Sequence, residues 1–192
     1  MAQTAEQLAT EARRLTAERG LTGYTVEELC DSVGISRRTF FNYFAAKEDA
    51  VLGLPVRRDH PDVEGRFLAA AREPASDGLS TTLMQDLAEL AAARWEASGI
   101  SPAVAVELVA VVEREPRLLA RMLELMRAQE QGDSALVEQR EHLQPGDLRA
   151  VTAVQLIGAL SRSSVEEFLT RPESEPFRAV LARRLAAARS VF

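Results

Sequence analysis

Apolar residues recur along this chain at intervals of three and four positions, which is the spacing of one face of an α-helix. In residues 3–19 the apolar stripe passes through Leu8, Ala12 and Leu15. No segment of the sequence alternates apolar and polar residues in the way that predicts a strand. The same helical spacing in the next segment groups four apolar residues: Val26, Leu29, Cys30 and Val33. The pattern therefore predicts an all-α fold.

Longer helices are expected beyond residue 60, where proline or serine stands near the start of each apolar pattern. The composition agrees, since 46% of the 192 residues are hydrophobic and only eight prolines and ten glycines interrupt the chain. Residues 73–79 form the clearest expected loop. The predicted helices beyond residue 60 are 61–72, 80–97, 102–114, 117–140, 146–170 and 174–190.

Shorter helices with well-marked ends are expected just after the first helix. Thr25 followed by Glu28 matches a capping box, which starts a helix. Gly34 suits the left-handed turn that would end this helix, and Ser36 is the expected N-cap of a third helix over 37–43. Two helices joined by such a short turn predict a helix-turn-helix.

The predicted third helix carries two adjacent arginines, Arg37 and Arg38, in its first turn. Positive charge at a helix N-terminus opposes the helix dipole, so this locally unfavourable placement indicates a functional role. Arginine is the residue that most often contacts guanine in the major groove, because its planar fork matches the O6 and N7 acceptors. Lys47, at the expected start of a fourth helix, can hold a phosphate. Phe40 and Phe44 are expected to face the core.

Residues 8–52 resemble the DNA-binding domain of the tetracycline-repressor (TetR) family. The matching features are Thr25-Val26, the turn Val33-Gly34-Ile35-Ser36, the segment Thr39-Phe40-Phe41-Asn42-Tyr43-Phe44, and Lys47-Glu48. The resemblance implies an all-helical homodimer, each subunit pairing an N-terminal three-helix helix-turn-helix domain with a larger helical ligand-binding and dimerisation domain. We accordingly expect a DNA-binding domain over 1–46 and an effector-binding and dimerisation domain over 47–192, connected by a helix over 47–57. Ala46 departs from the family's usual Ser, Thr or Asn, which gives up a helix cap worth about 1 kcal/mol.

The resemblance also implies roles for particular residues. Those expected to contact bases are Arg37, Arg38 and Phe41. Those expected to contact DNA phosphates are Thr25, Thr39, Tyr43 and Lys47. An apolar pocket for an unidentified small-molecule effector would be lined by Met84, Leu87, Trp95, Leu108, Val112, Met122 and Met126. The dimer interface, expected on the last two helices, would use Val154, Ile157, Gly158, Phe168, Phe177, Leu181 and Leu185.

The net charge of −6 is unusual for a DNA-binding protein, but the charge is unevenly distributed. Residues 1–58 carry eight Arg and Lys against eight Asp and Glu, whereas the remaining residues carry fifteen against twenty-one. The N-terminal region is therefore neutral. The acidic remainder fits a separate sensing and dimerising body that does not touch DNA.

Other chemistries have little support in the sequence. Cys30 is the single cysteine, so no intramolecular disulfide or cysteine-based zinc site can form, and we expect no metal and no cofactor. No nucleophile–base spacing or glycine-rich phosphate loop indicates an enzyme, so no catalytic residue is assigned. The polar N-terminus and the lack of an apolar run approaching about 20 residues predict a cytoplasmic protein with no membrane contact.

The sequence therefore favours a dimeric, sequence-specific transcriptional repressor, released from a palindromic double-stranded DNA operator by a small-molecule effector. Two alternatives stay open. One is an activator or a ligand-independent regulator on the same scaffold. The other is a non-enzymatic interaction protein with a vestigial helix-turn-helix.

Overall fold

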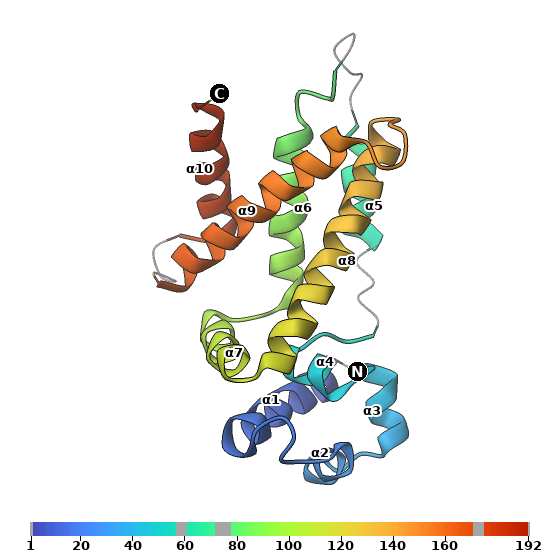
Figure 1. The fold of residues 1–192 in the computed structure, drawn as a ribbon, viewed down its shortest axis with the longest axis vertical. Helices are drawn as coiled ribbons and strands as arrows, with labels where there is room; N and C mark the ends of the chain where they lie inside the picture. The colour runs from blue at the N-terminus through green and yellow to red at the C-terminus, as the bar shows by residue number, and fades with distance from the viewer. Residues whose placement is uncertain (1, 57–60, 72–77, 171–174, 192) are drawn as a thin grey trace. The chain divides into compact units, whose positions relative to one another are not determined.

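The computed structural model describes residues 2–56, 61–71, 78–170 and 175–191, and every regular element within these ranges is an α-helix (Figure 1). The all-α prediction is confirmed. In chain order the helices are α1 (Ala2–Arg19), α2 (Val26–Val33), α3 (Arg37–Tyr43), α4 (Lys47–Leu52), α5 (Pro61–Ala69), α6 (Leu83–Ser98), α7 (Pro102–Arg114), α8 (Pro116–Arg140), α9 (Leu148–Thr170) and α10 (Phe177–Arg189).

Most helices lie within a few residues of their predicted bounds, but the fourth is shorter than expected. The connecting helix predicted over 47–57 ends at Leu52, because Gly53 adopts a left-handed conformation with φ of +69°. The last helix begins at Phe177 rather than at residue 174, with Pro176 in extended conformation before it. Most of the loop expected over 73–79 lies outside the described residues.

The chain divides into two compact units, and each contains two separate segments. The N-terminal unit comprises Met1–Asp59 and Ala103–Leu125, and the C-terminal unit comprises His60–Pro102 and Met126–Phe192. This division differs from the boundary expected between residues 46 and 47. The reason lies in packing, because α4 lies against α1 and most of α7 belongs to the same unit as the helix-turn-helix.

The N-terminal unit is built around the apolar stripe of α1. Leu8, Ala12 and Leu15 are buried as predicted, and α1 packs against both α2 and α4. From the second segment of the unit, Val112 and Leu118 enter the same core. The short helices of the DNA-binding region therefore depend on one shared core for their stability.

The C-terminal unit is built around α6, which packs against α5, α9 and α10. Three aromatic side chains, Trp95, Phe168 and Phe177, join α6, α9 and α10, with ring centroids 5.0 to 6.3 Å apart. Arg140 is buried in the same unit, where its guanidinium lies 2.5 Å from the Asp86 carboxylate and above the Phe67 ring. The buried cation is thus paired rather than isolated.

Candidate nucleic-acid interface

A capping box begins α2, as the sequence predicted. The Glu28 backbone N–H donates to the Thr25 hydroxyl at 3.1 Å, and the Glu28 carboxylate accepts from the Thr25 backbone N–H at 2.7 Å. These hydrogen bonds from Thr25 hold the pKa of the Glu28 carboxyl below its ordinary value. The two partners are three residues apart at the exposed start of the helix. Local contacts therefore determine where α2 begins.

The turn between α2 and α3 has the predicted chemistry. Gly34 has a φ of +76°, and its N–H donates to the Asp31 carbonyl at 3.2 Å. Ser36 then caps α3, accepting a hydrogen bond from the Thr39 backbone N–H at 3.1 Å. The Ile35 side chain is partly buried against the core of the N-terminal unit. The turn therefore fixes the direction in which α3 begins.

Two phenylalanines anchor α3 to the core. Phe40 has no exposed surface and Phe44 has 1% exposed, with their ring centroids 5.9 Å apart. Phe41 packs edge-on against Phe40 and keeps 45% of its surface exposed. Because the core faces one side of this short helix, Arg37 and Arg38 lie exposed.

The two arginines differ in their surroundings. Arg37 forms an ion pair with Glu27 of α2, with 2.7 Å between Nη1 and Oε1, and its guanidinium carbon lies 6.0 Å from the centre of the Phe41 ring. Arg38 has no ion-pair partner among the described residues. One candidate base contact is therefore held by neighbours, whereas the other is free to extend.

The four side chains predicted to contact DNA phosphates already contact other groups of the N-terminal unit. The hydroxyls of Thr25 and Thr39 already take part in helix caps. Tyr43 is half-buried against the core. Lys47 donates from Nζ to the Tyr24 carbonyl at 2.5 Å, and its ammonium lies 4.3 Å from the centre of the Tyr24 ring. No pattern in the sequence predicted a role for Tyr24, although it stands just before Thr25, the N-cap of α2.

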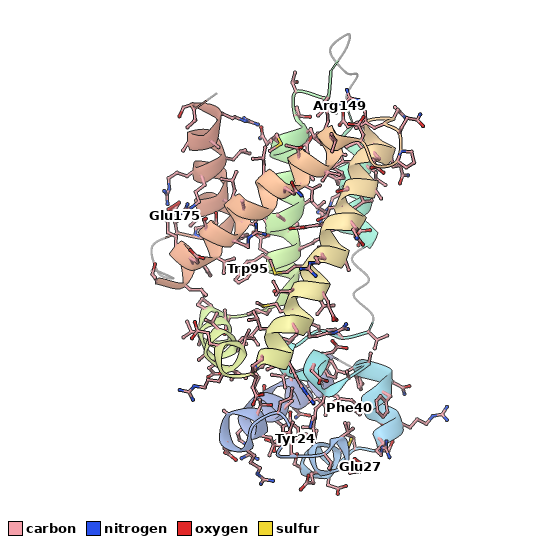
Figure 2. The ribbon with its side chains drawn as sticks, viewed as in Figure 1. Tyr24, Glu27, Phe40, Trp95, Arg149 and Glu175 are labelled. Atoms are coloured by element: carbon pink, nitrogen blue, oxygen red, sulfur yellow. The ribbon has the colours of Figure 1, made fainter. Side chains whose placement is uncertain are left out.

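Tyr24 joins several parts of the N-terminal unit (Figure 2). Its side chain is buried, with the hydroxyl 2.9 Å from the Thr16 hydroxyl and 3.2 Å from the Ala12 carbonyl. Burial raises the pKa of the Tyr24 phenol to about 12, so this group stays protonated and continues to donate. Tyr24 therefore links α1 to the start of α4 through Lys47.

The start of α4 lacks a side-chain cap, as Ala46 predicted. Ala46 already has the extended backbone of an N-cap residue, so serine could accept a backbone hydrogen bond there without rearrangement. We expect Ala46→Ser to stabilise the N-terminal unit by about 1 kcal/mol in urea denaturation. The adjacent exposed Ala45→Ser is the matched control, and equal stabilities for the two variants would contradict this expectation.

Two polar contacts tie the helix-turn-helix to the second segment of the N-terminal unit. Asp49 of α4, which is buried, accepts from the Arg121 guanidinium of α8 at 2.8 and 3.3 Å, and this hydrogen bonding raises the pKa of Arg121. The Leu21 backbone N–H donates to the Glu115 carboxylate at 2.8 Å. These partners are about 70 to 95 residues apart in sequence, so no local pattern could have paired them.

The predicted effector-pocket residues do not gather in one cluster. In the C-terminal unit, Leu87 is a core residue, Met84 and Trp95 are partly buried against that core, and Met126 is half-buried outside it. In the N-terminal unit, Val112 is a core residue, and Leu108 and Met122 are partly buried against that core. A surface groove of about 170 Å³ between α6 and α10 contains none of them. Its volume is also below the range of roughly 300–1,000 Å³ that small-molecule pockets occupy. Their apolar spacing matches core packing within each unit, and the effector pocket stays a prediction.

Most of the predicted dimer-interface residues are already covered within the subunit. Each of five is at most 5% exposed: Val154, Ile157, Phe177, Leu181 and Leu185. Phe168 is half-buried against aromatic neighbours, and Gly158 lies near the Arg162 guanidinium. The five buried side chains fill the core of the C-terminal unit, and their place in a dimer interface stays a prediction. The large apolar side chains that α9 exposes are Leu148 and Leu156.

The described residues show neither a metal-binding cluster nor a single membrane-spanning helix. Among the described residues, no group of three or more His, Cys, Asp or Glu side chains is arranged to hold a metal ion. None of the described helices is by itself long and apolar enough to span a bilayer. The pair α6 and α7 reaches the required length and apolar composition only when the two helices are counted together across the bend between them.

The fold and this surface define a helix-turn-helix DNA-binding protein. Residues 8–52 match the family model described as bacterial regulatory proteins, tetR family. The chain is also similar to the HTH-type transcriptional regulator TcmR of Streptomyces glaucescens, with 29% identity over 176 residues, which cover 90% of this chain and 76% of that relative. The matched residues contain the turn and the aromatic segment on which the resemblance rests, and the similarity to TcmR extends over most of the chain.

Proposed function

We propose that the protein is a dimeric repressor that binds a palindromic operator and is released from it by a small-molecule effector. The observation that carries the proposal is the orientation of α3. Phe40 and Phe44 fix the helix in the core while Arg37, Arg38 and Phe41 remain exposed. A helix held this way can enter the major groove with its N-terminal residues against base edges.

The roles proposed for individual residues follow from their chemistry. Arg37 and Arg38 donate to guanine O6 and N7, and Phe41 contacts an apolar base edge such as a thymine methyl group. Thr25, Thr39, Tyr43 and Lys47 contact phosphates, which position the helix without specifying sequence. In a two-fold dimer, two such helices about 34–36 Å apart would meet successive major grooves. A regulator of this kind would act in the cytoplasm.

The operator can be found with the full chain. Selection from a pool of random-sequence duplexes should yield a palindromic motif, and sedimentation should give a particle of twice the 21.0 kDa subunit mass. Deletion of the gene should raise expression of a reporter placed behind this motif. Selected sequences without a shared motif, or a reporter that falls on deletion, would contradict sequence-specific repression.

An effector should reveal itself by stabilising the protein. A thermal-shift screen of small molecules against the full chain should find compounds that raise the melting temperature, because ligand that binds only the folded state stabilises it. The same compounds should lower operator affinity, since their effect is bounded by their differential affinity for the two states. Compounds that stabilise the protein without changing operator affinity would argue for ligand-independent regulation.

Substituting Lys47 should weaken binding to all DNA alike. Removing one phosphate contact lowers affinity for operator and unrelated duplexes by the same factor, and makes the slope of log K against log salt shallower by about 0.9. We expect this result for Lys47→Gln. Because Lys47 also donates to the Tyr24 carbonyl, the melting temperature of the variant must be measured in parallel. A changed preference among base sequences would contradict the phosphate role.

A further inference from the structure

An acidic side chain stands beside one of the two candidate base-contacting arginines. Glu27 lies in the first turn of α2, and its carboxylate is 2.7 Å from the Arg37 guanidinium in the first turn of α3. Figure 2 marks Glu27 on α2. On another side of Arg37 lies the ring of Phe41, which is itself braced edge-on by the buried Phe40. Arg37 is therefore held by groups from two helices.

Neither folding stability nor DNA affinity explains this ion pair. The side chains of Glu27 and Arg37 are 51% and 61% exposed, and pairs this exposed contribute little to stability. A carboxylate next to a surface that meets phosphates also weakens attraction for every DNA sequence. The ion pair does restrict the mobility of the Arg37 side chain and reduce the charge that it presents to DNA. Both properties affect discrimination between base sequences.

We propose that Glu27 is a positioning residue, which holds Arg37 in the orientation needed for one base pair and so increases discrimination between DNA sequences. The inference rests on the proposed function, in which Arg37 contacts a base. Glu27 is itself well placed for the task, because a negative charge is favourable in the first turn of α2.

Arg37 keeps hydrogen-bond donors for a base while it is paired with Glu27. A guanidinium has five N–H donors in a rigid fork, and Glu27 lies against Nη1, which leaves donors directed elsewhere for guanine. Pairing also neutralises the charge that would otherwise draw Arg37 to the nearest phosphate. On docking, loss of water strengthens the pair, so the orientation is maintained when the base is contacted.

Glu27→Gln tests the proposal, because glutamine keeps the length of the side chain and removes its charge. The probes are the duplex selected by the wild-type protein, its single-base-pair variants, and an unrelated duplex of equal length. We expect Glu27→Gln to bind the unrelated duplex about two- to fivefold more tightly. Discrimination at the base pair where Arg37→Ala loses preference should fall about five- to tenfold, and the salt slope should steepen by about 0.9.

Asp31→Asn is the matched control. Asp31 lies on the same helix and is also exposed, but it forms no ion pair with Arg37. Its substitution makes the same change in net charge, so any general electrostatic gain should appear in both variants. The loss of discrimination should appear only in Glu27→Gln.

A double-mutant cycle separates positioning from other effects. In the Arg37→Ala background, Glu27→Gln should leave discrimination unchanged, because its effect acts through Arg37. Unchanged or improved discrimination in Glu27→Gln, with a clear loss in Arg37→Ala, would overturn the positioning role while leaving the proposed function intact. If Arg37→Ala itself loses preference at no base pair, the base contact of Arg37 fails, and the role of Glu27 fails with it.

Discussion

Replacing Arg38 with alanine is expected to reduce the preference for operator over unrelated DNA by roughly 10- to 100-fold, the effect of losing one bidentate base contact. Arg38 is exposed in the first turn of α3 and has no ion-pair partner among the described residues, so its donors are available to DNA. Fluorescence anisotropy with labelled operator and unrelated duplexes at fixed salt measures both affinities.

The control for this experiment is Arg127→Ala. Arg127 is an exposed arginine of α8 in the C-terminal unit, so its removal changes net charge equally without touching α3. Its substitution should leave the ratio of the two affinities unchanged. If Arg38→Ala weakens operator and unrelated DNA by the same factor, then Arg38 contacts phosphate rather than a base.

Phe40→Ala is expected to destabilise the N-terminal unit by about 3–5 kcal/mol, a large part of the stability of a typical domain. Phe40 has no exposed surface, and its ring contacts those of Phe41 and Phe44. Truncation would leave a cavity beneath a helix of only seven residues, which is too short to persist without its core contacts. Urea denaturation followed by circular dichroism should show the loss.

Phe41→Ala is the natural comparison, because the neighbouring ring is 45% exposed. Its removal should cost less than about 1 kcal/mol of stability while still weakening operator binding. Trp95 lies in the C-terminal unit, so its fluorescence reports unfolding there separately. Equal destabilisation by the two substitutions would mean that Phe40 does not anchor α3 as its burial indicates.

The parts of the interface that sequence predicted well are those determined by neighbours in the chain. The capping box of Thr25 and Glu28, the left-handed Gly34 and the Ser36 cap all depend on contacts within three residues. The inward placement of Phe40 follows from helical spacing alone. Such features need no knowledge of the remaining chain, so a single sequence is sufficient to predict them.

Periodicity could not decide which neighbour covers an apolar face. The spacing in α9 and α10 showed correctly that Ile157 and Leu181 are buried, but periodicity does not distinguish a subunit's own core from a dimer interface. For the same reason the predicted pocket combined residues from two cores. The sequence did not predict the Glu27–Arg37 pair, because the two residues are ten positions apart and lie on different helices.

The sequence by itself determined the helices, their caps, the helix-turn-helix and the presence of two arginines at the start of α3. These follow from backbone preferences and hydrogen bonds over a few residues. Only the tertiary structure decided that residues 103–125 share a core with the DNA-binding helices, that Tyr24 holds Lys47, and that Glu27 holds one arginine while leaving the other free. Those contacts join residues on different elements, and their geometry exists only once the helices have packed.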